Sequence, residues 1–118
     1  MQLLSKVGLE GGVTQGLGIL DAEVVKMYPE NNEPTPHIGW NQINHDGERL
    51  FTGISKNADF YFVHSFYMKL NERLKNFSVD YGGLHTCFVE KDNIFGAQFH
   101  PEKSQIVGLK FMENFLYA

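Results

Sequence analysis

The segment NIFGAQFHPEK, residues 93–103, constrains this chain more than any other part of the sequence. It begins with apolar and aromatic residues that are typical of a largely buried strand, and Gly96 allows another backbone to approach closely. Pro101 cannot donate to a β-ladder, and it biases the residue before it toward an extended conformation. We therefore predict a strand over residues 93–99 that ends where His100 emerges.

His100 and Glu102 lie two residues apart in this extended segment, so both side chains are expected on the same side. There the Glu102 carboxylate can accept a hydrogen bond from one imidazole nitrogen and leave the other free. This arrangement is the orienting half of a nucleophilic triad, in which the carboxylate fixes the tautomer and the histidine carries a proton. The alternative is a surface turn with an incidental ion pair, and the spacing alone favours it.

Three ordered segments resemble class I glutamine amidotransferases, namely PHIGWNQ at residues 36–42, FYFVHSFY at 60–67 and QFHPEKS at 98–104. QFHPE is shared across that class, whereas the other two segments resemble the glutaminase subunits of imidazole glycerol phosphate synthase. The similarity extends over essentially the whole chain. It implies an α/β fold, the C-terminal portion of a class I glutamine amidotransferase domain, with a mixed β-sheet flanked by helices. Residues 1–118 are then one partial domain that lacks the N-terminal parallel strands.

The family pattern also indicates where a nucleophile is expected. In these enzymes the catalytic cysteine lies in a strand-to-helix elbow that reads roughly Gly-x-Cys-x-Gly and continues directly into Met-Gln-Leu-Leu. This chain opens on that tetrapeptide at residues 1–4. The resemblance therefore implies that the nucleophile lies upstream of residue 1, and we expect these 118 residues alone to be inactive in glutamine hydrolysis.

The resemblance further implies the activity of the whole enzyme and a role for individual residues. Glutamine is hydrolysed to glutamate and ammonia through a Cys-His-Glu triad without a metal or cofactor, and ammonia passes to a (β/α)8-barrel cyclase subunit for histidine biosynthesis. The triad members carried by this chain are His100 and Glu102. The positions that match the glutamine pocket are Gln2, Glu10, His64, Ser65 and Phe66. The positions that match the face toward the cyclase are Trp40, Tyr61 and Lys103.

The residues alone favour a plainer interpretation for most of these positions. Gln2 and Glu10 would be an exposed glutamine and a solvated glutamate before a glycine turn. His64 would be a strand histidine satisfied by the backbone, and Trp40 and Tyr61 would be core aromatics. Two other functions also stay open, a related amidotransferase that feeds another synthase, for example in surface-sugar amination, and a non-catalytic binding subunit.

Composition is that of an ordinary soluble enzyme, with 42% hydrophobic and 20% charged residues, enough for the core of one domain. The formal net charge of −4 gives no reason to expect nucleic acid or an anionic membrane as partner. No apolar stretch approaches the length of a transmembrane helix, and no signal peptide is visible. A single cysteine cannot form an internal disulfide, which agrees with a cytoplasmic location. The five histidines lack the close spacing of a zinc site.

Cys87 is the only thiol that could be paired with His100. It lies in the run His-Thr-Cys-Phe-Val, residues 85–89, which is typical of a strand interior. A nucleophile needs an exposed position with nearby amide donors for the oxyanion, and a strand interior offers neither. We predict that Cys87 is a small buried hydrophobic residue.

Helical periodicity predicts two helices, one at each end of the chain. The first covers residues 1–9 and stops at two consecutive glycines. The second covers residues 104–116, with Ser104 placed to cap its start. The apolar face of the second helix comprises Ile106, Leu109, Met112, Phe115 and Leu116.

The remaining elements are predicted to be strands, turns and loops. One or two strands are expected within residues 17–27, and single strands over 37–43, 58–67 and 79–89. Residues 90–92 are typical of a hairpin turn, which would join the last of these strands to the strand at 93–99. The other connections are a loop over 28–36, a turn at Asp46 and Gly47, and a short helical piece near Leu50.

Overall fold

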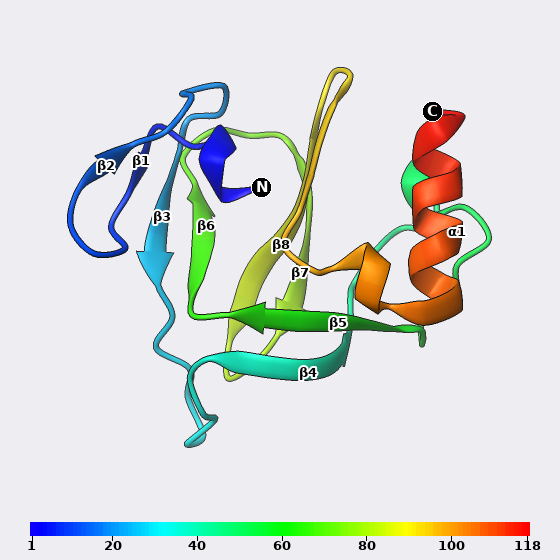
Figure 1. Cartoon of the computed structure of the whole chain (residues 1–118), viewed down its shortest axis with the longest axis horizontal. Coiled ribbons are helices and arrows are strands. Elements are labelled where there is room, and N and C mark those ends of the chain that lie inside the picture. The colour runs from blue at the N-terminus through cyan, green and yellow to red at the C-terminus, as the bar shows by residue number, and fades with distance from the viewer.

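A computed structural model describes all 118 residues, whose strands form three small sheets with one α-helix packed at one end (Figure 1). The first sheet runs in the order β2 (Thr14–Gln15), β1 (Val7–Gly8), β3 (Ala22–Lys26) and β6 (Phe66–Leu70). The second pairs β4 (His37–Gln42) with β5 (Asp59–His64), and the third runs β7 (Lys75–Asp80), β8 (Leu84–Lys91) and β9 (Ile94–Ala97). The helices are η1 (Gln2–Leu4), η2 (Arg49–Phe51), η3 (Pro101–Lys103) and α1 (Gln105–Leu116). The predicted α/β class is confirmed, with the strands divided among three sheets.

Several local predictions are confirmed by this arrangement. The region 28–36 is a loop, β3 lies within 17–27, and the short helical piece near Leu50 is η2. β8 and β9 form the predicted hairpin, with Lys91 opposite Ile94 across a two-residue turn.

Two predicted strands are each divided in the structure. The strand expected over 58–67 breaks at Ser65, where the chain leaves the sheet of β5 and enters the sheet of β6. The strand expected over 79–89 is wrong, because the chain reverses direction between β7 and β8. Gly82 and Gly83 make this turn at φ 61° and 131°, a region that glycine enters without a steric penalty.

The predicted helix over residues 1–9 is also wrong beyond its first turn. η1 ends at Leu4, and the Ser5 hydroxyl donates to the Gln2 carbonyl at 2.7 Å. Ser5 itself is extended, and Val7 in β1 then pairs in parallel with Glu23 in β3. Pairing with strands distant in sequence therefore overrides the helical spacing of the apolar residues.

The main core is an aromatic cluster built around Phe51 of η2, which is 1% exposed. The centroid of its ring lies 5.0 to 6.3 Å from the centroids of five other phenylalanine rings. These rings come from β5, β7, β8, α1 and the segment after β9. These five are Phe60, Phe77, Phe88, Phe99 and Phe111. The cluster joins the second and third sheets to α1.

The helix α1 contacts this core through one narrow side. Phe111 is buried, and a Cβ on Gly108 would lie 1.7 Å from the Pro101 carbonyl oxygen, so only glycine fits there. The predicted apolar face is present but largely uncovered, with each of its residues between 45% and 81% exposed, and only its Phe115 ring contacts a ring beside the core, that of Phe95. None of the helices combines the length and apolarity needed to cross a membrane.

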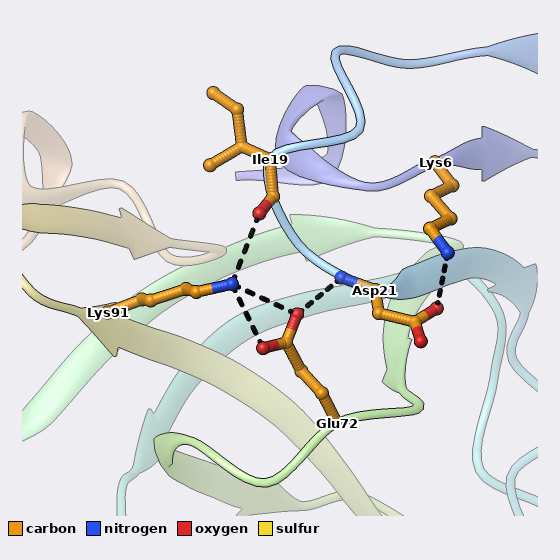
Figure 2. Close-up of polar contacts among 5 residues, drawn as sticks. All are labelled: Lys6, Ile19, Asp21, Glu72 and Lys91. Atoms are coloured by element: carbon orange, nitrogen blue, oxygen red, sulfur yellow. Dashed lines mark hydrogen bonds and ion pairs between the residues drawn. The ribbon is translucent and has the colours of Figure 1, made fainter.

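A network of charges joins the first sheet to the third (Figure 2). Glu72, after β6, accepts from the Asp21 backbone N–H at 2.6 Å and from Lys91 Nζ at 3.0 Å. Lys91 also donates to the Ile19 carbonyl at 3.5 Å, and Lys6 lies 3.2 Å from the Asp21 carboxylate. The network therefore ties the segment before β3 to the end of β8.

Candidate active site

His100 lies just beyond β9, where the backbone is extended and Pro101 begins η3. Its Nδ1 lies 2.8 Å from Oε1 of Glu102, which is the contact expected from their spacing. The hydrogen bond from His100 lowers the pKa of the Glu102 carboxyl below its usual value, so the group is ionised at neutral pH. An ionised carboxylate only accepts, so Nδ1 carries the hydrogen and Nε2 of the neutral ring is bare. A bare Nε2 is the atom that a general base requires.

The backbone of His100 is held in place by β5 and by one hydroxyl. Its N–H donates to the Tyr61 carbonyl at 3.0 Å. Its carbonyl accepts from the Ser104 hydroxyl at 2.7 Å, and Ser104 Oγ accepts from the Tyr61 N–H at 3.0 Å. The predicted capping role of Ser104 is wrong, because its hydroxyl is engaged here and makes no capping bond to α1. The buried Ser104 side chain instead completes the ladder between β5 and the segment that carries His100.

A pocket of about 540 Å³ lies beside His100, where η1, the turn between β5 and β6, and the segment after β9 meet. Glu102 does not line this pocket and reaches it only through His100. Six residues singled out from the sequence line it together: Gln2, Glu10, His64, Ser65, Phe66 and His100. The fold therefore gathers these positions from three distant parts of the chain.

Hydrogen bonds tie the walls of this pocket to one another. The Gln2 amide nitrogen lies 3.1 Å from the Phe66 carbonyl oxygen and 2.9 Å from Gln98 Oε1. The same Phe66 carbonyl accepts from His64 Nδ1 at 3.0 Å. Gln98 and Ser104 are absent from the residues predicted to form the site. Both belong to the QFHPEKS segment, and that membership is the signal that could have identified them.

The three residues predicted to face a partner gather on one surface. Trp40 and Tyr61 are direct cross-strand neighbours in β4 and β5, with ring centroids 5.6 Å apart in an edge-to-face arrangement. Lys103 Nζ lies 5.9 Å from the centroid of the Tyr61 ring. The Trp40 side chain is 48% exposed, so this residue is not part of the core.

Cys87 is fully buried in β8, within the aromatic core. Its burial raises the pKa of the thiol well above its ordinary value, because the thiolate would lose its hydration there. The prediction of a small buried hydrophobic residue is confirmed. No other thiol occurs in the chain.

Comparison with known proteins identifies the family to which this chain is similar. The family model described as glutamine amidotransferase class-I matches residues 1–118. Imidazole glycerol phosphate synthase subunit HisH 1 of Campylobacter jejuni, strain 81-176, is 47% identical over 98% of this chain and 58% of its own length. Subunit HisH of the same synthase from Pelagibacter ubique is 44% identical over 98% of this chain and 57% of its own length. The chain therefore spans somewhat less than three fifths of the length of these two relatives.

A solved structure shows the same fold at low sequence identity. The crystal structure of a protein from Thermoplasma acidophilum, described as one subunit of a GMP synthase, superposes with a TM-score of 0.65 at 20% identity. The superposition covers 82% of this chain and 48% of that one. With the family model matching from the first residue to the last, the chain belongs to the class-I glutamine amidotransferase family.

Proposed function

We propose that residues 1–118 form the base-bearing part of the glutaminase subunit of an imidazole glycerol phosphate synthase. The observation that carries this proposal is the hydrogen bond between His100 and Glu102 beside an open pocket. The names of the Campylobacter and Pelagibacter relatives support this enzyme over other class I amidotransferases.

The proposed chemistry passes through a thioester. His100 Nε2 takes the proton of a cysteine thiol, and the resulting thiolate attacks the side-chain amide carbon of glutamine. When the C–N bond of the tetrahedral intermediate breaks, the His100 imidazolium gives that proton to the nitrogen, which leaves as ammonia. His100 then takes a proton from the water that attacks the thioester and releases glutamate, while Glu102 holds the ring and stabilises the imidazolium. Because Cys87 is buried, the attacking cysteine comes from outside these 118 residues.

The substrate in this proposal is L-glutamine, bound in the pocket beside His100. Its side-chain amide faces the imidazole, and its amino-acid end contacts His64, Ser65 and Phe66. Gln2 and Glu10 complete the pocket. The hydrogen bonds that join Gln2, Phe66 and Gln98 support this assignment, because they give the pocket walls a defined spacing before any ligand enters.

The proposed partner is a (β/α)8-barrel cyclase subunit that docks over Trp40, Tyr61 and Lys103. Trp40 is exposed and packs on the partly buried Tyr61 beside the Lys103 cation, and such a group has the composition of an interface hot spot. The assembly would work in the cytoplasm, for histidine biosynthesis.

A chimera tests the proposal directly. The N-terminal portion of the Campylobacter jejuni relative is placed before residues 1–118, and glutamate release is measured with the other subunit of that synthase present. His100→Ala is expected to lower the rate by about 10²- to 10⁴-fold, and Glu102→Gln to lower it strongly as well. Glu113→Gln, on the exposed side of α1, is the matched control and should change nothing. Near-normal rates in both triad variants would refute the assignment.

A further inference from the structure

A pair of histidines, His37 and His64, lies at the back of the pocket. The chemistry proposed above gives no role to the contact between them. His37 begins β4, and His64 ends β5 directly opposite it in the register of the two strands. Nδ1 of His37 lies 3.0 Å from Nε2 of His64. The exposed fractions are 2% for His37 and 6% for His64, and of the two only His64 lines the pocket.

The partners of His64 determine where the hydrogens lie. His64 Nδ1 is 3.0 Å from the Phe66 carbonyl oxygen, which can only accept, so Nδ1 carries the hydrogen. Nε2 of the neutral ring is then bare and accepts from His37 Nδ1. Both rings are therefore Nδ1–H tautomers, and hydrogen bonds run from His37 to His64 and from His64 to Phe66.

The surroundings of His37 keep it neutral and in place. Its ring stacks on Phe62 and Tyr81, with centroids 4.9 and 3.9 Å away. Burial, followed by the nearby His64 and His85, lowers the pKa of His37 to about 4. The neutral His37 ring has one N–H, and the 3.0 Å contact places it toward the bare Nε2 of His64.

The same chain of hydrogen bonds reaches the other pocket walls. The Phe66 carbonyl accepts from the Gln2 side chain as well as from His64, and Gln2 continues to Gln98. A rotation of the His64 ring would therefore remove one of the two side-chain donors that hold the Phe66 carbonyl and leave it bound to Gln2 of η1 alone. Nothing else contacts Nε2 of His64 through a hydrogen bond.

We propose that His37 is a positioning residue of the glutamine pocket. By donating to His64 it fixes the ring that holds the Phe66 carbonyl, and it thereby fixes the wall against which the amino-acid end of the ligand binds. The identity of that ligand rests on the proposed function, whereas the tautomers and the hydrogen bond between the two rings do not.

The first test is a ¹⁵N spectrum of the histidine rings in the 118-residue chain. We expect Nδ1–H tautomers for His37 and His64 and a scalar coupling between His37 Nδ1 and His64 Nε2 across the hydrogen bond. His45 is the internal control, because Gly47 N–H donates to its Nδ1 and its Nε2 lies 3.2 Å from the Ser55 carbonyl, so it must be the Nε2–H tautomer. An Nε2–H tautomer at His64, or the absence of the coupling, would overturn the proposal.

The second test separates positioning from chemistry in the chimera. His37→Phe keeps a ring to stack on Tyr81 but removes the donor, and should raise KM for glutamine about tenfold with kcat changed far less. His37→Asn places an amide nitrogen where Nδ1 lies and should restore KM. An unchanged KM in a folded His37→Phe protein would overturn the role, as would a failure of Asn to improve on Phe.

The two tests keep the proposals distinguishable. A chimera without glutaminase activity would count against the proposed function, and the spectrum would still decide whether the His37–His64 bond exists. If His37→Phe does not fold, the unmodified chimera still decides the question, because glutamine should shift the His37 and His64 ring signals and leave those of His45 in place. Equal shifts at all three, or none, would refute the positioning role.

Discussion

Buried His37 should make the folded chain sensitive to mild acid. In the folded state the pKa of His37 is about 4, against an ordinary value of 6.5, because its ring is buried beside two other histidines. Above pH 6.5 the ring is neutral in both the folded and unfolded states and contributes no pH dependence. Between pH 6.5 and 4 the unfolded chain binds a proton that the folded chain does not, so stability falls as the pH falls.

The size of this effect follows from the difference of about 2.5 between the two pKa values, at about 1.36 kcal/mol for each unit. The full loss is about 3 kcal/mol at pH 4 and below, and about 2 kcal/mol of it falls between pH 7 and pH 5. His64 and His85 have pKa values lowered by burial as well, so they act in the same direction. The carboxylates with lowered pKa values, such as Glu102, stabilise the folded state while they are ionised, and they lose this stabilisation only at more acidic pH.

His37→Asn tests this reasoning, because the variant keeps a donor toward His64 and cannot titrate. Urea unfolding of both proteins at pH 7 and pH 5 can be followed by the fluorescence of Trp40, the only tryptophan, at micromolar concentration. We expect the unmodified chain to lose about 2 kcal/mol more than His37→Asn between the two pH values. Equal losses in the two proteins would show that His37 is protonated in the folded state and would refute the argument.

Three further predictions concern the core, the ladder beside His100 and the outer face of α1. Phe51→Ala removes the ring at the centre of the aromatic cluster and should cost about 3–5 kcal/mol of unfolding free energy, measured in urea. Ser104→Ala leaves the Tyr61 N–H buried without a partner, so it should cost about 1–3 kcal/mol and lower kcat in the chimera; a normal kcat would contradict the account of how His100 is held. The 118 residues alone should self-associate through the apolar face of α1 as concentration rises. Leu109→Lys, on that exposed face, should weaken the association in sedimentation velocity without lowering stability, and unchanged association would exclude this face.

Local signals in the sequence were sufficient to predict the structure where one residue type determines the backbone conformation. His100 before Pro101 is extended as predicted, although the strand β9 ends at Ala97 and not at residue 99, and the helix after Ser104 has the predicted bounds to within a residue. The contact between His100 and Glu102 also follows from local spacing, since only two residues separate them. These features depend on neighbours in the chain, which the sequence displays directly.

The features that depend on strand pairing could not be predicted in this way. η1 stops at Leu4 because the following residues pair with β3, and the break at Ser65 reflects two different sheets on either side. The hydrogen bond between His37 and His64 joins residues 27 apart and needs the register of β4 against β5. A shift of one residue in that register would turn one ring to the other face of the sheet and abolish the contact.

β5 is where these long-range contacts converge, and this explains why the site residues lie so far apart in the sequence. The backbone of Tyr61 holds the His100 segment, both directly and through the Ser104 hydroxyl, while its partly buried side chain packs edge-to-face against the exposed Trp40. Three residues further along, the same strand ends at His64 and turns into the pocket wall. One strand therefore fixes the distances among the base, the pocket and the aromatic surface. Any change in the pairing of β5 must move all three together.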